Sequence, residues 1–249
     1  MPSTTDMLVA FGVWDHVIGI SSHCQPPQGS APVPIVGSGM DPDIEQILAL
    51  QPDLVVGSAA QSDYEFVRTL ERSGITVRLL DDQRLPSLLE DMVIFGRDVG
   101  AEEAARAFVD ELRASLTRLQ QATNSLPTPS VLVVYGHDPI FAAGPDSYVG
   151  SILEAAGGEN AVPSGDWVQL DRETVVALNP DVILEPTLGE PATVADLRAP
   201  WTALTTVGAV RDGRIFQIRS PAATRPGPQI AEAAWEIATI LHPAIGSPP

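Results

Sequence analysis

The sequence predicts an α/β protein of two lobes, each with a mostly parallel sheet, joined by one long rigid helix. Three observations predict this fold. The segment DIEQILALQPDLVVGS at residues 43–58 is echoed by DRETVVALNPDVILEP at residues 171–186, an offset of 171 − 43 = 128 in a chain of 249 residues. Short apolar runs alternate with helical patterns in both halves of the chain. Between the halves lies a stretch that carries helical patterns and no strand signal.

Each predicted strand is a short apolar run, rich in β-branched residues and bounded by turn residues. The runs are His16–Ile20, Leu54–Val56 and Val77–Leu80 in the first half, and Val131–Tyr135, Val182–Leu184 and Ile215–Ile218 in the second. Strands that are apolar along their whole length are typical of parallel sheets, because both faces of such sheets are covered. Both halves are therefore expected to form small α/β lobes.

Helices are predicted between these strands. Thr5–Gly12 follows polar capping residues and ends at a glycine. Asp43–Leu50 is closed by Pro52, and Tyr64–Ser73 presents an apolar face and stops before Gly74.

The middle of the chain, Leu85–Thr123, contains helical patterns on either side of Gly96–Gly100. The second pattern, Glu102–Thr123, repeats apolar residues at spacings of three and four. At ~1.5 Å per residue this helix spans about 33 Å, which is comparable to the diameter of a small domain. We therefore expect residues 1–84 to form a first lobe, 85–126 a helical linker and 127–249 a second lobe.

Composition excludes several classes of protein. The net charge of −18 argues against a nucleic-acid partner, since phosphates are neutralised by clustered cations. All fourteen Lys and Arg residues are Arg, which removes Schiff-base lysines and Walker-type phosphate loops. The single cysteine, Cys24, excludes an intrachain disulfide and a zinc cluster of cysteines. The sequence contains no apolar run of ~18 residues, so it predicts no membrane-spanning helix.

The repeated pairs Pro52-Asp53 and Pro180-Asp181 suggest at first a pair of active-site carboxylates. We interpret them as scaffold, because each Pro ends a helix and each Asp stabilises the turn into a strand. They also precede their strands, whereas ligands of α/β proteins bind beyond the carboxyl ends of strands.

Several segments, taken in order, resemble one family. Those of the first lobe are PSTTDMLVAFG at 2–12, VIGISSHCQPP at 17–27 and the helix–strand segment at 43–58. Those of the second lobe are FAAGPDSYVGSILEAAGGENA at 141–161, DWVQLDRETVVALNPDVIL at 166–184, AVRDGRIFQI at 209–218 and RPGPQIAEAAWEIATIL at 225–241. The chain thus resembles the class III periplasmic solute-binding proteins that serve ABC importers for cobalamin, iron-siderophores and haem. The match is nearest to the cobalamin-binding type, mainly through Trp167 and the run around it.

The resemblance implies a protein without enzymatic activity, which captures a small-molecule metal chelate in a cleft between two lobes. It implies delivery to an ABC transporter permease at the membrane, with no cofactor and no resident metal site. We expect a monomer. The family has a strand before the segment that matches PSTTDMLVAFG, and our hypothesis is that the natural gene starts upstream of Met1 with that strand and an export signal or lipid-anchoring cysteine. The protein would then be periplasmic or extracellular and anchored to the membrane, although no export signal is visible in this sequence.

Loops at the carboxyl ends of the strands are expected to line the cleft. In the first lobe they are Ser3–Thr5, Ser21–Cys24, Gly37–Gly39 and Ser58–Gln61, from which we select Thr4, His23, Ser38 and Ser58 as ligand-binding residues. In the second lobe they are Gly136–Phe141, Asp166–Trp167 and Ala222–Arg225, from which we select His137, Phe141, Trp167 and Arg225.

Each of these residues also has a structural interpretation. Trp167 precedes a predicted helix start, where it could stack on a flat macrocycle or serve in packing. Arg225 could clamp a carboxylate or phosphate of the ligand, or be a surface residue. His137 could contact ligand or lie in a solvated loop, and His23-Cys24 could contact ligand or metal, although adjacent loop residues rarely chelate one ion. Trp235 is expected in the core, with Trp14 and Trp201 in core or surface packing.

An acidic residue on each lobe docks to the permease in this family, and Glu65 lies near the first-lobe position. No second-lobe counterpart is assigned. Other functions stay open beside the importer: a haem-binding protein of the same family, or an intracellular corrinoid- or metal-sensing module. A Ser-His-Asp hydrolase is disfavoured, because no G-x-S-x-G motif occurs.

Overall fold

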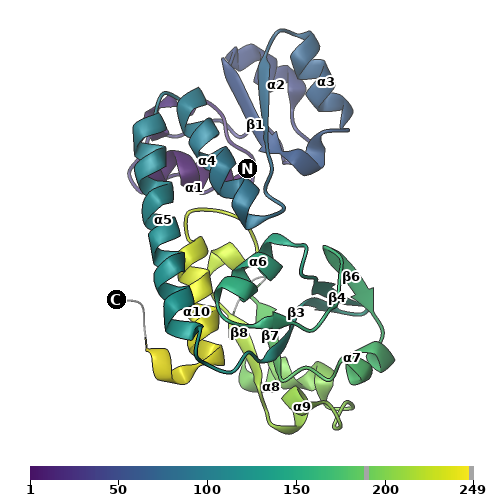
Figure 1. Ribbon diagram of the computed structural model, residues 1–249. Helices are drawn as coiled ribbons and strands as arrows, with labels where there is room; N and C mark the ends of the chain where they lie inside the picture. Colours follow the sequence, from purple (N-terminus) through teal and green to yellow (C-terminus); the bar gives the residue numbers. More distant parts are fainter. Residues whose placement is uncertain (188–190, 247–249) are drawn as a thin grey trace. The chain divides into compact units, whose positions relative to one another are not determined.

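The structure is a computed structural model that describes residues 1–187 and 191–246 (Figure 1). It contains two compact units. The first comprises Met1–Asp82 and Pro86–Glu111, and the second comprises Gln83–Leu85 and Leu112–Pro249. Helix α5 (Glu102–Thr123) begins in the first unit and ends in the second. The long helix predicted from the sequence is therefore present with the predicted bounds.

The first unit has a two-stranded parallel sheet, in which β1 (Leu54–Ser58) lies beside β2 (Thr76–Leu80). Its helices are α1 (Pro2–Ala10), α2 (Ile44–Leu50), α3 (Glu65–Arg72), α4 (Leu85–Asp98) and the first part of α5. Phe11, which follows α1, meets Phe108 of α5 edge-on with ring centroids 6.0 Å apart. This contact packs the start of the chain against the long helix within the same unit.

The prediction of a strand at His16–Ile20 is wrong. A single 3₁₀ turn covers Trp14–His16, and only Ile20 makes a bridge, to Ile35. An apolar β-branched run becomes a strand only where a neighbour satisfies its backbone groups, and no strand lies beside this run in the described residues.

The second unit has a six-stranded sheet with the order β6-β4-β3-β7-β8, and β5 pairs with β3 beside this path. The strands are β3 (Ser130–His137), β4 (Ile140–Ala143), β5 (Glu159–Asn160), β6 (Trp167–Leu170), β7 (Val182–Pro186) and β8 (Ile215–Ile218). β3, β7 and β8 run parallel, as the sequence predicts, whereas β4 and β6 are antiparallel additions.

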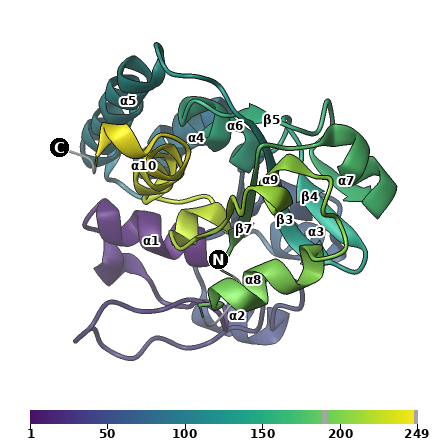
Figure 2. The same ribbon diagram turned by 90° about the horizontal axis from the view of Figure 1, so that it is seen from below.

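The helices of the second unit are α6 (Tyr148–Ala155), α7 (Arg172–Leu178), α8 (Val194–Arg198), α9 (Gly208–Arg211) and α10 (Ile230–Leu241), together with the end of α5. Both views show α10 beside α5, with α6 close to it (Figure 2). The indole N–H of Trp235 in α10 donates to Ser115 Oγ of α5 at 3.2 Å. Trp235 is 6% exposed, so its prediction as a core residue is confirmed.

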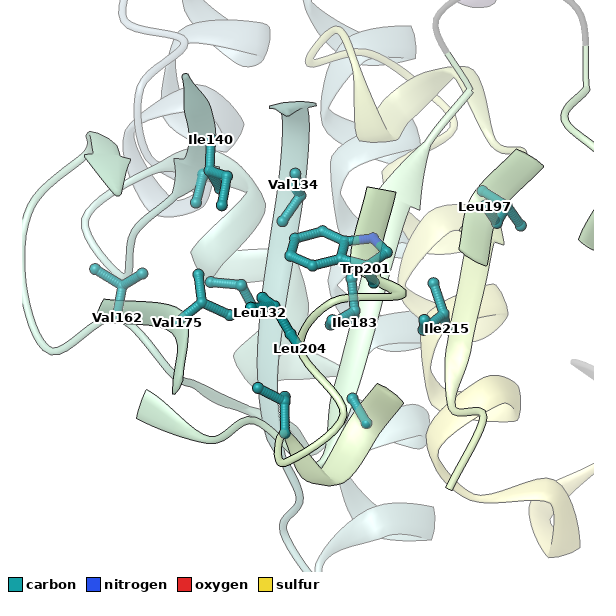
Figure 3. Close-up of a cluster of buried hydrophobic side chains, with 13 residues drawn as sticks. Leu132, Val134, Ile140, Val162, Val175, Ile183, Leu197, Trp201, Leu204 and Ile215 are labelled. Carbon is teal, nitrogen blue, oxygen red and sulfur yellow. The ribbon is translucent and has the colours of Figure 1, made fainter. Parts of the chain in front are cut away.

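One apolar cluster fills the space between the sheet and helices α7 to α9. Figure 3 shows the Trp201 ring among side chains of β3 and β7, including Val134 and Ile183. Trp201 is 1% exposed and therefore belongs to the core. The scaffold role of Asp181 is also confirmed, because its carboxylate accepts a hydrogen bond from the backbone N–H of Ser130 at 3.0 Å. None of the helices in the described part of the chain is long and apolar enough to cross a membrane.

Candidate functional site

Two aromatic side chains stack on the surface of the second unit. Phe141 in β4 and Trp167 in β6 lie with their ring planes 8° apart and their centroids 5.5 Å apart. Both are exposed, Phe141 by 37% and Trp167 by 41%. Antiparallel pairing places Ala143 opposite Trp167 and Phe141 opposite Gln169, so the two rings are diagonal neighbours on one face of the sheet.

Alternation along the strands separates this face from the core. Ile140 and Ala142 belong to the apolar cluster, and Val168 packs against it. Phe141 and Trp167, one residue out of step, therefore point away from that cluster. The expectation that Trp167 lies in a loop before a helix is wrong, since it begins strand β6. Trp167 therefore has its backbone fixed by β6, the strand at one edge of the sheet.

Tyr135 completes a cluster of three rings, which we call the aromatic surface: Tyr135, Phe141 and Trp167. The Tyr135 ring stands edge-on to Trp167, with centroids 4.8 Å apart and planes at 82°. Its hydroxyl donates a hydrogen bond to the carbonyl of Ala223. Burial raises the pKa of Tyr135 well above its ordinary value, so the phenol stays protonated and keeps this bond.

The bond from Tyr135 brings the segment that carries Arg225 close to the aromatic surface. Ala223 ends a 3₁₀ turn at Pro221–Ala223, and the backbone N–H of Arg225 donates to the Pro221 carbonyl at 3.1 Å. Arg225 is half-buried. Of the four residues predicted in this unit, the structure stacks Phe141 on Trp167 and ties the Arg225 segment to the same group of rings.

His137 lies at the end of β3 and is held by a buried carboxylate. Its Nε2 lies 3.0 Å from Oε1 of Glu185, at the end of the neighbouring strand β7. The same oxygen accepts from Trp201 Nε1 at 2.7 Å, and Glu185 is only 9% exposed. The His137 ring also stands edge-on to Trp201, with centroids 5.5 Å apart. His137 therefore does not lie in a solvated loop, as one interpretation of the sequence had it, but ends a strand and contacts Glu185.

The contact with Glu185 sets which nitrogen of His137 carries a proton. A carboxylate oxygen accepts, so Nε2 must be the protonated nitrogen in the neutral ring. Nδ1 then remains an acceptor. In its neutral form, His137 thus offers a hydrogen-bond acceptor at the carboxyl edge of the sheet, where ligands of α/β proteins bind.

In the first unit, the predicted polar side chains make bonds within the scaffold. Thr4 is buried in α1 and its hydroxyl donates to the Met1 carbonyl at 2.8 Å. Ser38 accepts from the backbone N–H of Asp41 at 2.9 Å. Thr4 and Ser38 line one groove, which contains neither Ser58 nor His23.

Ser58 lies at the end of β1, and its hydroxyl donates to Oδ1 of Asp82 at 2.7 Å. Burial raises the pKa of Asp82, and the bond from Ser58 opposes this shift. Ser58 therefore stabilises the charged form of a half-buried carboxylate. A contact with ligand stays a prediction for Thr4, Ser38 and Ser58.

His23 and Cys24 make separate contacts in this structure. His23 is exposed and its Nδ1 lies 3.2 Å from Ser22 Oγ, whereas Cys24 is buried with Sγ 3.2 Å from Ser21 Oγ. In the described residues, no group of three His, Cys, Asp or Glu side chains is placed to hold a metal ion.

Glu65 begins α3 and is exposed. Its carboxylate pairs with Arg72, and with Arg68 at 3.7 Å, on the same helix. Exposed ion pairs of this kind are weak, typically ~0–1 kcal/mol, so they leave Glu65 able to exchange partners.

Sequence reasoning missed Tyr135 and Glu185. Tyr135 ends the apolar run VLVVY, and its pattern predicts only a buried strand residue. Glu185 follows directly on the apolar residues of β7 with no local pattern that distinguishes it from a solvated charge.

The two α/β units repeat one helix–strand pair and share one long helix, and the second unit carries the exposed stacked aromatics. These features are those of a two-unit α/β binding protein. The periplasmic binding protein family model matches residues 1–222, and the chain belongs to that family.

Named relatives agree with this assignment. An uncharacterized ABC transporter substrate-binding lipoprotein, YvrC of Bacillus subtilis, is 29% identical over 251 residues, which cover 98% of this chain and 78% of that protein. The cobalamin-binding protein of Halobacterium salinarum is 26% identical over 250 residues, with 97% of this chain and 68% of that protein covered. The solved structure of the periplasmic haem-binding protein HutB of Vibrio cholerae has a TM-score of 0.85 at 22% identity, covering 97% of this chain and 96% of that one. At this identity the structural likeness shows the fold.

Proposed function

We propose that this protein is the substrate-binding component of an ABC importer and that its ligand is a flat metal chelate, with a corrinoid such as cobalamin as the first choice. Family membership supports the binding role. The names of the relatives from Bacillus subtilis and Halobacterium salinarum support the importer and the corrinoid.

The observation that carries the proposal is the aromatic surface. Phe141 and Trp167 are stacked and exposed on a sheet that fixes their backbone. Large exposed apolar side chains that gather in one place mark ligand or protein contacts. A planar macrocycle fits such rings, because it buries a large apolar area at little cost in conformational entropy.

Arg225 and His137 supply the polar part of the proposed contact. The guanidinium of Arg225 suits a phosphate or carboxylate on the rim of the chelate, because it can donate two parallel hydrogen bonds. His137 presents Nδ1 as an acceptor while Glu185 holds its other nitrogen. In this proposal the metal arrives as part of the ligand.

Isothermal titration calorimetry with cyanocobalamin, haemin and the ferric siderophore ferrichrome tests the proposal. We expect saturable binding of cyanocobalamin. Trp167→Ala and Phe141→Ala should each raise its dissociation constant about tenfold or more, since tenfold corresponds to about 1.4 kcal/mol and a lost aromatic anchor costs ~2 kcal/mol or more.

Phe216→Ala is the matched control, because Phe216 in β8 is 36% exposed and lies outside the aromatic surface. It should leave the dissociation constant unchanged within about twofold. Binding of haemin alone would contradict the corrinoid and keep the importer as a haem-binding protein. If none of the three ligands binds, the proposed role in import of a metal chelate is contradicted, and a sensing role becomes the favoured alternative.

We further propose that Glu65 contacts the permease. The exchangeable pairs of Glu65 with arginines of its own helix support a carboxylate that can meet basic residues of a partner. Glu65→Arg should lower the stimulation of the permease's ATPase activity by the loaded protein while its ligand affinity stays the same. Glu71→Arg on the same helix is the control, and an equal loss for both variants would contradict a specific role of Glu65. The name of the Bacillus subtilis relative, a substrate-binding lipoprotein, supports a place of action outside the cytoplasmic membrane.

A further inference from the structure

A half-buried carboxylate adjoins the aromatic surface. Asp166 directly precedes Trp167, which begins the edge strand β6. In the part of the chain that the structure describes, no other residue donates a hydrogen bond to the Asp166 carboxylate. Polar groups that are withdrawn from water are nearly always hydrogen-bonded in native proteins. Asp166 therefore holds acceptor capacity beside Trp167 that the protein itself does not use.

Backbone hydrogen bonds fix the place of Asp166 beside the turn that follows β4. The Gly144 N–H donates to the Asp166 carbonyl at 2.7 Å, and the Asp146 N–H donates to the Gly165 carbonyl at 3.0 Å. Gly144 leaves no room for a side chain, because a Cβ there would collide with the Gly165 carbonyl. The position of Asp166 relative to Trp167 is therefore set by the fold of this unit.

The charges around Asp166 leave one negative charge uncompensated. Both oxygens of Asp146 are occupied, since Oδ2 accepts from the Gly165 N–H at 3.0 Å and Oδ1 lies 3.3 Å from Nη1 of Arg84, which belongs to the same unit. Burial raises the pKa of Asp166 most, Asp146 raises it further, and Arg84 lowers it. One guanidinium thus faces two carboxylates, and Asp166 is the one with no hydrogen-bonded partner among the described residues.

A ligand on the aromatic surface meets this carboxylate with its rim. An N–H group on the rim can donate to Asp166, and such charge-assisted hydrogen bonds are stronger than neutral ones. A carboxylate on the rim would be repelled, and an apolar rim would take water from Asp166 without replacing it. The segment that carries Arg225 is tied to Tyr135, so groups that need a cation have a different place on this surface.

We propose that Asp166 is a specificity-determining residue, which accepts a hydrogen bond from a primary amide on the rim of the bound macrocycle and disfavours macrocycles that carry a carboxylate there. This inference rests on the proposed function and deepens it. It narrows the ligand from a flat metal chelate in general to a corrin-like ring with amide side chains.

Calorimetric titration with two corrinoids that share one ring tests this inference. Dicyanocobinamide carries primary amides on its rim, and dicyanocobyrinic acid carries carboxylates in their place. We expect the parent protein to bind the amide form about tenfold or more tightly than the carboxylate form. Asp166→Ala should lower this ratio at least about fivefold, by weakening the amide form and strengthening the carboxylate form. Asp166→Asn keeps an acceptor oxygen, so it should weaken the amide form less.

Glu173→Gln is the matched control, because the protein has a net charge of −18 and repels any polyanion at long range. It removes the same charge from an exposed residue in the first turn of α7 and should change the ratio by less than about twofold. A loss of both forms to the same extent in Asp166→Ala would reflect a structural defect and overturn the role in specificity.

Equal ratios in the parent and Asp166→Ala overturn the inference while corrinoid binding, and with it the proposed function, stands. A parent protein that binds the carboxylate form as tightly as the amide form also overturns it. If neither form nor cyanocobalamin binds, the proposed corrinoid ligand and the inference fall together.

Discussion

The pair α2–β1 in the first unit and the pair α7–β7 in the second have the same local structure. Their bounds differ by 128 residues at every end. Asp43 and Asp171 cap the two helices by accepting hydrogen bonds from backbone N–H groups three residues later, at 2.9 Å and 2.7 Å. Gln51 and Asn179 end them in the left-handed conformation. The same sequence pattern therefore forms the same local structure twice.

The surroundings of the two pairs differ. All five residues of β7 are buried, because β3 and β8 flank it and helices cover it. The first three residues of β1 are half-buried, because in the described residues β2 is the one strand that pairs with it. Burial of a strand is thus decided by its neighbours, while its existence is decided by its own sequence. Four predictions test this comparison.

The largest change in the free energy of unfolding is expected when matched apolar side chains of β7 and β1 are truncated. Ile183 in β7 is fully buried, and Ile183→Ala should lower the free energy of unfolding by about 2–5 kcal/mol. Val55, its counterpart in β1, is half-buried, so Val55→Ala should cost roughly 1 kcal/mol. Guanidinium unfolding curves of the two variants measure both values.

Equal costs at the two positions would contradict the difference in burial.

The second largest change in stability is expected at the position that is Glu185 in β7 and Gly57 in β1. Glu185→Leu would leave the indole N–H of Trp201, which is 1% exposed, without its acceptor. An unsatisfied buried donor costs about 1–3 kcal/mol. Glu185→Gln keeps an acceptor oxygen and should cost clearly less. If the two variants unfold at the same denaturant concentration, the bond to Trp201 contributes nothing to stability.

A smaller effect is expected at the left-handed ends of the two helices. Gln51→Gly should stabilise the first unit by about 0.5–1 kcal/mol, because glycine adopts positive φ without strain and only part of this gain is lost to unfolded-state entropy. Asn179 differs, since its Oδ1 accepts a hydrogen bond from the Gly208 N–H at 2.9 Å. Asn179→Gly should therefore bring no gain. Differential scanning calorimetry compares the variants, and equal stabilisation by both would contradict a role of that bond.

The smallest effect concerns pH. Burial raises the pKa of Asp82 in the folded state, so the folded protein binds more protons than the unfolded chain between the ordinary Asp pKa of about 3.9 and the raised value. Stability due to this group falls as pH rises through that window. Asp82→Asn should remove this dependence, and Ser58→Ala should extend it to higher pH by removing the bond that favours the charged form.

The difference between the parent and Asp82→Asn, measured by thermal unfolding at several pH values, isolates this group from the other carboxylates. A difference that does not change with pH would contradict a raised pKa of Asp82.

Much of the fold is predictable from particular residues. The β-branched runs at Leu54–Val56, Val131–Tyr135 and Val182–Leu184 are strands, and Glu102–Thr123 is one helix. The three strands are continuous apolar runs bounded by turn residues, and the helix repeats its apolar residues over 22 positions. β4 and β6 have four residues each, which is too short for alternation to be distinguished from chance.

Part of the candidate site is predictable for the same reason. The sequence predicts Trp167, Phe141, Arg225 and His137 at the site, because they follow predicted strands or precede helices. The stacking of Phe141 on Trp167 depends on the register of β4 and β6, which is a contact between segments 26 residues apart, 167 − 141 = 26. The anchoring of His137 by Glu185 depends likewise on β3 and β7 being neighbours.

The sequence by itself determined the duplicated helix–strand pairs, their capping aspartates and the long helix, because these rest on interactions between residues a few positions apart. The tertiary structure alone decided which strands are buried, which aromatic rings stack, and that His16–Ile20 is not a strand. Such outcomes depend on partners distant in the chain, since a strand is completed and a side chain is buried only by what lies beside it.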